Sequence, residues 1–155
     1  AMIVDLIRND IGKISVPGSV TVDFHARIME FPTLFHLFSS VSGKINGVEG
    51  LDVFLSLFPG GSITGAPKIS AVNIISKIEK YKRGVYTGAI GWVGVNGNSV
   101  FNIPIRTIQR DGETLFYNAG GGITWLSEPE LELEESLTKT RSFLNIFSEW
   151  EILFD

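Results

Sequence analysis

The sequence predicts an α+β fold, in which antiparallel sheets and packed helices form a single domain over residues 1–155. Apolar residues alternate along residues 20–31, which is typical of a strand. Between residues 69 and 78 they recur every three residues instead, which indicates an amphipathic helix. Asn-Gly at 96–97 and Asp-Gly at 111–112 separate further apolar runs, as the turns of β-hairpins do.

The first half of the chain contributes two strands and two helices to this prediction. Residues 3–8 are a short apolar run that ends a helix or a strand. Residues 34–41 are nearly all apolar, so we expect a second, well-buried strand there. Residues 51–58 fit a short helix. Residues 67–82 fit an amphipathic helix with a proline at or near its first position and Gly84 beyond its end.

The second half predicts an antiparallel meander of three strands. The strands are expected at residues 85–95, 99–109 and 114–124, with the two hairpin turns between them. Pro104 falls inside the middle strand and lacks an N–H to donate, so it indicates an edge or a bulge.

The last predicted helix carries an acidic stripe. Ser127 and Glu130 form an S-x-x-E capping box, which opens a helix that runs to about residue 149. At 100° per residue one stripe of this helix collects four charged side chains, namely Glu128, Glu132, Glu135 and Lys139. Stacked carboxylates destabilise a helix unless a cation lies among them, and either Lys139 or a bound Mg²⁺ can serve. A solvated acidic face near the helix N-terminus is the alternative.

Composition excludes several classes of protein. The chain has 155 residues with 13 Lys and Arg against 17 Asp and Glu, and a net charge of −4 argues against a nucleic-acid partner. It has no cysteine, which excludes disulfides, thiolate zinc sites and a cysteine nucleophile. No apolar run is long enough to span a membrane and no secretory leader opens the chain, so we expect a cytoplasmic protein without a membrane partner.

Two numbers are high for a small globular domain. Mean hydropathy is +0.22 although 19% of residues are charged, and the chain has 17 glycines. Either the domain has much backbone-lined binding surface, or it belongs to something larger whose other part covers an apolar face.

The glycine-rich segment at residues 59–68 has the features of an anion site. It is not a Walker A loop, because only three residues separate Gly61 from Gly65. The hydroxyls of Ser62 and Thr64 and the N-terminus of the following helix nevertheless converge there. A helix cap with a tight turn is the alternative.

Three consecutive glycines mark a second place where a ligand can approach the backbone. Gly120, Gly121 and Gly122 end the third predicted strand, and they form either a bulge or a binding surface. Arg106 lies in a strand that looks buried, so its guanidinium needs an internal carboxylate or an acidic ligand. Tyr86 fits either core packing or a hydroxyl donor.

His36 lies in an apolar run, where a histidine is either a core residue or a catalyst. Taken together, two glycine loops, an arginine, a lysine and an acidic stripe suit a small carboxylated substrate bridged to Mg²⁺. These features indicate no particular reaction.

Five blocks of sequence resemble the signatures of chorismate-utilising enzymes. They are MIVDLIRND at 2–10, PGGSITGAPK at 59–68, IPIRT at 103–107, AGGGI at 119–123 and the ExxExxxK segment at 132–139. Their order and spacing hold along nearly the whole chain. The GSITGAPK motif is similar to that of aminodeoxychorismate synthases, whereas a GTLSGAPK motif is more usual in anthranilate synthases. Anthranilate, isochorismate and salicylate synthases are the alternatives within the family.

The resemblance implies a role for each candidate residue. Glu135 resembles the Mg²⁺ ligand of the last helix, with Glu132 beside it, and His36 resembles the catalytic histidine near the leaving hydroxyl. Arg106 and Tyr86 resemble the pair that binds a chorismate carboxylate. The residues implied in substrate binding are Ser62, Tyr86, Arg106, Gly120, Gly121, Gly122 and Lys139.

The implied fold is part of the two-sheet sandwich of chorismate-binding enzymes. The implied reaction adds ammonia at one ring carbon of chorismate while a hydroxyl leaves another, and a glutamine amidotransferase subunit supplies the ammonia. The resemblance covers only the C-terminal part of the longer family domain. The upstream lysine motif and the glutamate before the first block are absent from the sequence.

Two hypotheses follow. The first is an enzyme fragment that is inactive or weakly active alone. The second is a non-catalytic module that self-associates through an exposed sheet face or is completed by a separate N-terminal chain.

Overall fold

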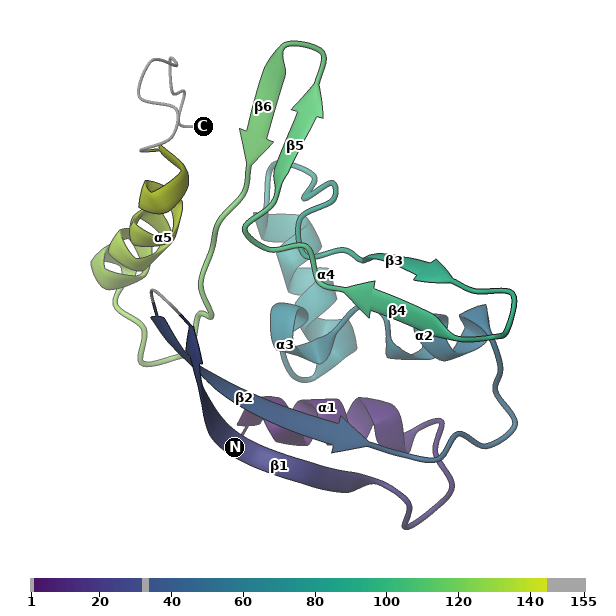
Figure 1. Ribbon diagram of the computed structural model, residues 1–155. Helices are drawn as coiled ribbons and strands as arrows, with labels where there is room; N and C mark the ends of the chain where they lie inside the picture. Colours follow the sequence, from purple (N-terminus) through teal and green to yellow (C-terminus); the bar gives the residue numbers. More distant parts are fainter. Residues whose placement is uncertain (1, 32–33, 145–155) are drawn as a thin grey trace. The chain divides into compact units, whose positions relative to one another are not determined.

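The computed structural model describes residues 2–31 and 34–144, and the chain divides into two compact units. Unit 1 comprises Ala1–Lys82 and Gly91–Val100, and unit 2 comprises Arg83–Ile90 and Phe101–Asp155. Figure 1 shows the elements of both units in chain order. The single domain expected over residues 1–155 stays a prediction.

Unit 1 is built on a long hairpin with a helix along it. The elements of its first segment are α1 (Met2–Gly12), β1 (Thr21–Phe31), β2 (Leu34–Ser42), α2 (Leu51–Leu57), α3 (Gly61–Thr64) and α4 (Lys68–Ile78). β1 and β2 pair antiparallel from Thr21 opposite Ser42 to Phe31 opposite Leu34. Helix α1 contacts both strands and lies along β2 (Figure 1).

The helices and strands expected in unit 1 are confirmed, but the burial expected for the second strand is wrong. On β2, Phe35 is 73% exposed and Leu37 is 72% exposed. Ile28, which pairs with Leu37 across the hairpin, is 65% exposed. An apolar strand is buried only where another layer covers it, and no described element of unit 1 covers these side chains.

The helix expected at residues 67–82 is shorter than predicted. Pro67 is the N-cap of α4, and the helix ends at Ile78, where the three-residue apolar repeat stops. Glu79 is already extended, with φ −72° and ψ 121°, so the end expected at Gly84 is wrong. One helical turn, α3, lies inside the glycine-rich segment that precedes α4.

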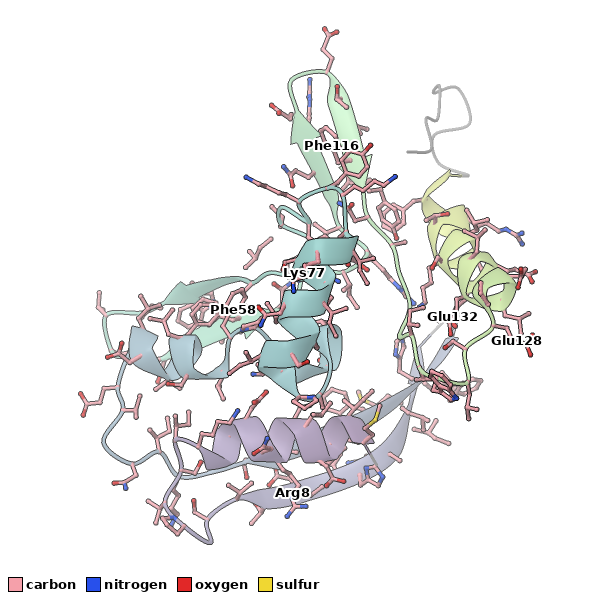
Figure 2. The ribbon with its side chains drawn as sticks, turned by 180° about the vertical axis from the view of Figure 1, so that it is seen from behind. Arg8, Phe58, Lys77, Phe116, Glu128 and Glu132 are labelled. Atoms are coloured by element: carbon pink, nitrogen blue, oxygen red, sulfur yellow. The ribbon has the colours of Figure 1, made fainter. Side chains whose placement is uncertain are left out.

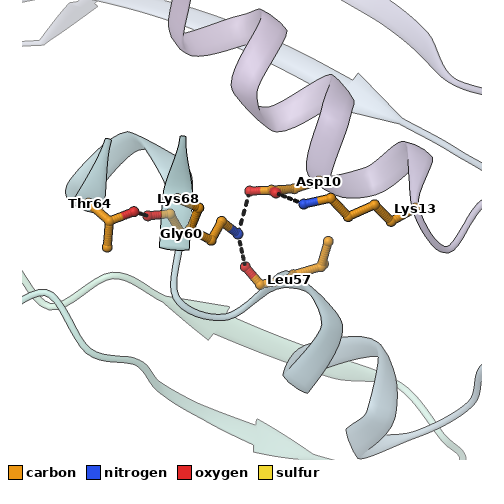
Figure 3. Close-up of polar contacts among 6 residues, drawn as sticks. All are labelled: Asp10, Lys13, Leu57, Gly60, Thr64 and Lys68. Atoms are coloured by element: carbon orange, nitrogen blue, oxygen red, sulfur yellow. Dashed lines mark hydrogen bonds and ion pairs between the residues drawn. The ribbon is translucent and has the colours of Figure 1, made fainter. Parts of the chain in front are cut away.

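A buried ion pair fixes α4 to α1. Asp10 is only 7% exposed, and its carboxylate accepts bonds from Lys68 at 2.9 Å and from Lys13 at 3.0 Å (Figure 3). Lys68 also donates to the carbonyl of Leu57 at 3.3 Å. Burial raises the pKa of Asp10, but the hydrogen bonds and charges of the two lysines outweigh it and hold this pKa below its ordinary value.

The same carboxylate limits the space around α3. An ideal Cβ on Gly61 would lie 3.3 Å from Asp10 Oδ2. Thr64, at the other end of this turn, donates its hydroxyl to the carbonyl of Gly60 at 3.0 Å (Figure 3). The ion pair and the glycine-rich segment therefore pack as one piece within unit 1.

The three-stranded meander predicted for the second half is wrong. Two separate hairpins form instead, β3 (Ile90–Val93) with β4 (Ser99–Asn102) and β5 (Ile108–Asp111) with β6 (Thr114–Tyr117). Both predicted turns are confirmed, with Gly97 at φ 82° and Gly112 at φ 59°. The predicted middle strand is broken because Pro104 cannot donate to a ladder and Arg106 has φ 52°.

In unit 2, helix α5 (Pro129–Leu144) follows the β5–β6 hairpin, with its proline at the first helical position. The predicted capping box is wrong, because the Ser127 hydroxyl donates to Glu132 Oε1 at 2.6 Å. The predicted helix end near residue 149 lies outside the described residues. Within the described part of the chain, none of the helices has the length and apolar character of a membrane span.

Candidate active site

In unit 2, the three glycines after β6 lie against the first two turns of α5. An ideal Cβ on Gly121 would lie 2.8 Å from Glu132 Oε2 and 3.9 Å from Glu135 Oε1. Side chains three residues apart share one face of a helix, so both carboxylates reach the same point. A side chain at this position would require the Glu132 carboxylate to move.

Lys139 joins the same glycine segment to α5. Its Nζ donates to the carbonyl of Gly120 at 3.0 Å and forms an ion pair with Glu135 Oε1. The cation that the acidic stripe requires is therefore Lys139 in this structure. Glu128 precedes the first helical residue, and Figure 2 shows it away from Glu132, which lies on the side of α5 that faces the glycine segment.

Tyr86 approaches the glycine segment from another direction. An ideal Cβ on Gly120 would lie 3.1 Å from the hydroxyl oxygen of Tyr86, which is closer than most real Cβ contacts. The next residue, Thr87, has φ 58°, and its N–H donates to the carbonyl of Pro104 at 3.0 Å. The chain segments that carry Tyr86 and Arg106 are thus hydrogen-bonded to each other.

Arg106 differs from its prediction, because it is exposed and lies outside any strand. The buried residue of this segment is Pro104, and the chain bends after it with a bond from Ile105 N–H to the carbonyl of Ile103 at 2.9 Å. An exposed guanidinium does not need an internal carboxylate, and it is accessible to an acidic ligand.

Tyr117 is a residue of this region that the sequence did not single out. Its hydroxyl donates to the carbonyl of Lys139 at 3.4 Å, and its ring contacts Phe143 at a centroid distance of 4.5 Å. Burial raises the pKa of Tyr117 above its ordinary value. The positive charge of Arg106 lowers this pKa, and the charge interaction with Tyr86 raises it further. Both predicted carboxylate-binding residues therefore lie within electrostatic reach of Tyr117. The one sequence signal was its place three residues before the triple glycine.

His36 and Ser62 belong to unit 1. His36 lies opposite Met29 in the β1–β2 hairpin, and its side chain is exposed. Ser62 is exposed on α3. The roles that the resemblance implies for these two residues stay predictions.

The donors at Gly121 match those that Mg²⁺ takes from proteins. Mg²⁺ is commonly bound through one or two carboxylates, with waters and substrate oxygens completing the octahedron. Glu132 and Glu135 supply two carboxylates, and the lack of a side chain at Gly121 leaves space next to them. Within residues 2–31 and 34–144 there is no cluster of three or more His, Cys, Asp or Glu that could hold a metal alone, so the pair would need oxygens from elsewhere.

The sequence blocks that form this site are those of a known family. The profile of the chorismate binding enzymes matches residues 1–145, and the chain belongs to this family. It is 43% identical over 139 residues to aminodeoxychorismate synthase component 1 of Bacillus subtilis, and this alignment covers 89% of this chain and 30% of that protein. It is 42% identical over 150 residues to an anthranilate synthase component 1 of Haloarcula marismortui, and that alignment covers 96% of this chain and 31% of the relative.

A solved structure shows the same fold. The crystal structure of anthranilate synthase component I from Streptococcus pneumoniae superimposes with a TM-score of 0.78 at 37% identity, over 91% of this chain and 33% of that one. The α+β class and the resemblance to chorismate-utilising enzymes are therefore confirmed. The chain spans about a third of the length of these relatives. Relatives with two different activities are about equally similar, so the comparisons do not distinguish between them.

Proposed function

We propose that this chain is part of an enzyme that aminates chorismate to 4-amino-4-deoxychorismate, as an aminodeoxychorismate synthase component I. The observation that carries the proposal is the convergence of Glu132, Glu135 and Lys139 on the glycine segment 120–122. A substrate with two carboxylates needs cationic groups and backbone N–H donors, and Lys139 and the glycine segment would supply them next to the carboxylates of Glu132 and Glu135.

The substrate would be held from several directions. Arg106 and Tyr86 bind one chorismate carboxylate, because an exposed guanidinium and a nearby phenol hydroxyl form charge-assisted hydrogen bonds with it. Lys139, Ser62 and the backbone of Gly120, Gly121 and Gly122 line the rest of the site. His36 donates a proton to the hydroxyl that leaves the ring, as a general acid.

Glu132 and Glu135 would hold the Mg²⁺. When bound, the ion neutralises a substrate carboxylate and fixes the orientation of the ring. The nitrogen is ammonia, which a glutamine amidotransferase subunit supplies in the whole assembly. The protein acts in the cytoplasm, in the para-aminobenzoate branch of folate synthesis.

A second candidate is anthranilate synthase, which the Haloarcula relative and the Streptococcus structure favour. One experiment distinguishes the two candidates. A protein that carries this chain within a complete chorismate-binding domain is incubated together with chorismate, ammonium and Mg²⁺. Mass spectrometry then identifies the product. We expect 4-amino-4-deoxychorismate. Anthranilate would favour the second candidate, and unchanged chorismate would contradict both.

A further inference from the structure

We infer that Ser127 is a positioning residue for the Glu132 carboxylate, which it orients toward the backbone of Gly121; this inference rests on the proposed function. Ser127 is half-buried in the turn that joins the glycine segment to α5. We do not place it in contact with the substrate or the metal. It acts through the glutamate to which it is hydrogen-bonded.

The hydrogen bonds around Ser127 fix the direction of its proton. The N–H of Thr124 donates to Ser127 Oγ at 3.0 Å. A carboxylate oxygen only accepts, so the Ser127 hydroxyl donates to Glu132 Oε1 at 2.6 Å, which is the short distance of a bond to a charged oxygen. The Thr124 hydroxyl oxygen lies farther from Ser127 Oγ, at 3.4 Å. A further bond, from Ser127 N–H to the carbonyl of Thr124 at 3.1 Å, closes the turn.

This bond determines which carboxylate oxygen faces the glycines. Since Ser127 holds Oε1 of Glu132, the other oxygen, Oε2, is turned toward Gly121, where it lies 2.8 Å from the ideal Cβ position. Without Ser127, the carboxylate of a flexible, solvent-accessible glutamate can rotate between several orientations. Partners that orient a ligand in this way typically change metal affinity by about 10- to 100-fold when they are removed.

The two glutamates are held by different kinds of partner. Glu135 Oε1 is held by the charge of Lys139, and Glu132 Oε1 is held by the neutral hydroxyl of Ser127. A neutral donor orients a carboxylate without cancelling its charge, so Glu132 keeps its full attraction for a cation. Since Lys139 offsets part of the charge of Glu135, we expect Glu132 to attract a cation more strongly than Glu135 does.

The test compares Ser127→Ala with Ser127→Thr, which keeps the hydroxyl, and with the control Ser136→Ala. Ser136 lies on the same helix and has no hydrogen bond to either glutamate among the described residues. A protein that carries this chain within a complete chorismate-binding domain is labelled with ¹³C, because the two glutamates need oxygens from elsewhere to complete a metal site. The side-chain carboxyl resonances of Glu132 and Glu135 are followed by NMR, first without metal and then during titration with MgCl₂.

We expect Ser127→Ala to shift the Glu132 resonance in the absence of metal and to weaken Mg²⁺ binding about tenfold or more. Ser127→Thr and Ser136→Ala should resemble the unaltered chain in both measurements. If Ser127→Ala binds Mg²⁺ as well as the unaltered chain does, the positioning role is wrong and the metal site stands. If the unaltered chain shows no Mg²⁺-dependent shift at either glutamate, the metal site is wrong, and the role of Ser127 fails with it.

Discussion

Replacing the three consecutive glycines one at a time by alanine tests the geometry of the candidate active site. The three substitutions add the same methyl group to neighbouring positions, but the structure gives each a different neighbour. At Gly121 the new Cβ would lie 2.8 Å from Glu132 Oε2, at Gly120 it would lie 3.1 Å from the Tyr86 hydroxyl, and at Gly122 nothing lies within 4 Å. Gly122→Ala is therefore a matched control.

The magnitudes follow from these distances. A glycine-to-alanine change in a compatible backbone stabilises a protein by about 0.4–1 kcal/mol, because the unfolded chain loses freedom, and this is our expectation for Gly122→Ala. In Gly121→Ala the contact of 2.8 Å must open to the ordinary 3.4 Å or more, which the end of a glutamate side chain can do. The movement lengthens or breaks the bond from Ser127, whose loss costs about 1.5 kcal/mol. Gly121→Ala should thus be less stable than Gly122→Ala by about that amount.

Two measurements test these expectations. The first is the free energy of unfolding of the isolated chain in urea, and the second is the dissociation constant for Mg²⁺, from NMR titration of a protein that carries the chain within a complete chorismate-binding domain. We expect Gly121→Ala to weaken Mg²⁺ binding about tenfold, and Gly122→Ala to leave it unchanged. Gly120→Ala should disturb Tyr86 and leave Mg²⁺ binding close to normal. If Gly121→Ala and Gly122→Ala have the same stability and the same Mg²⁺ affinity, the carboxylate does not lie where the structure places it.

Four further predictions concern other parts of the chain. In a complete enzyme, Arg106→Ala should raise KM for chorismate by the equivalent of about 1.5–3 kcal/mol, because one charged hydrogen bond is lost, and an unchanged KM would count against its role. Glu135→Gln in the same enzyme should raise the Mg²⁺ concentration needed for half-maximal rate, and an unaltered Mg²⁺ dependence would remove Glu135 from the metal site. The pKa of Asp10 is lowered by folding, so its ion pairs stabilise the chain above about pH 4 and this stabilisation is lost as the pH falls further. Asp10→Asn should abolish this acid sensitivity in urea unfolding, whereas Asp5→Asn, which removes an exposed pair with Arg8, should preserve it. Finally, the isolated chain should give no product from chorismate, ammonium and Mg²⁺, and turnover would refute the view that it is a fragment. Gel filtration of the isolated chain should show no monodisperse dimer, and a stable dimer would favour a self-associating module.

Helical spacing alone predicted much of the acidic face. Glu132, Glu135 and Lys139 are three and four residues apart, and the structure places them together as that spacing requires. Glu128 was assigned to the same stripe, but the helix begins one residue later, at Pro129. Sequence patterns place helix ends only to within one or two residues, and here that uncertainty decided whether Glu128 lay in the stripe.

Other features depended on contacts that are distant in the sequence. The apolar run of β2 predicted burial, but burial requires a covering layer, which the described elements of unit 1 do not supply for Phe35 and Leu37. Pro104 predicted an edge or a bulge but not a break, because the residues of Ser99–Asn102 and Ile108–Asp111 read as one strand when the backbone angle of Arg106 is not known. The bond from Ser127 to Glu132 could not be read from the capping pattern, since the two residues are five apart and meet only after the turn has formed.

Whether the glycine segment and the two glutamates meet at one cation can be tested with Mn²⁺, a paramagnetic ion that takes the same oxygen ligands as Mg²⁺. Small amounts are added to a ¹⁵N-labelled protein that carries this chain within a complete chorismate-binding domain, and the broadening of each backbone amide signal is measured. We expect the signals of Gly121, Glu132 and Glu135 to broaden first and together, and added Mg²⁺ to reverse the effect. Broadening that begins elsewhere in the chain, or that spares Gly121 while α5 is affected, would contradict the convergence of the glycine segment and the two glutamates on one cation.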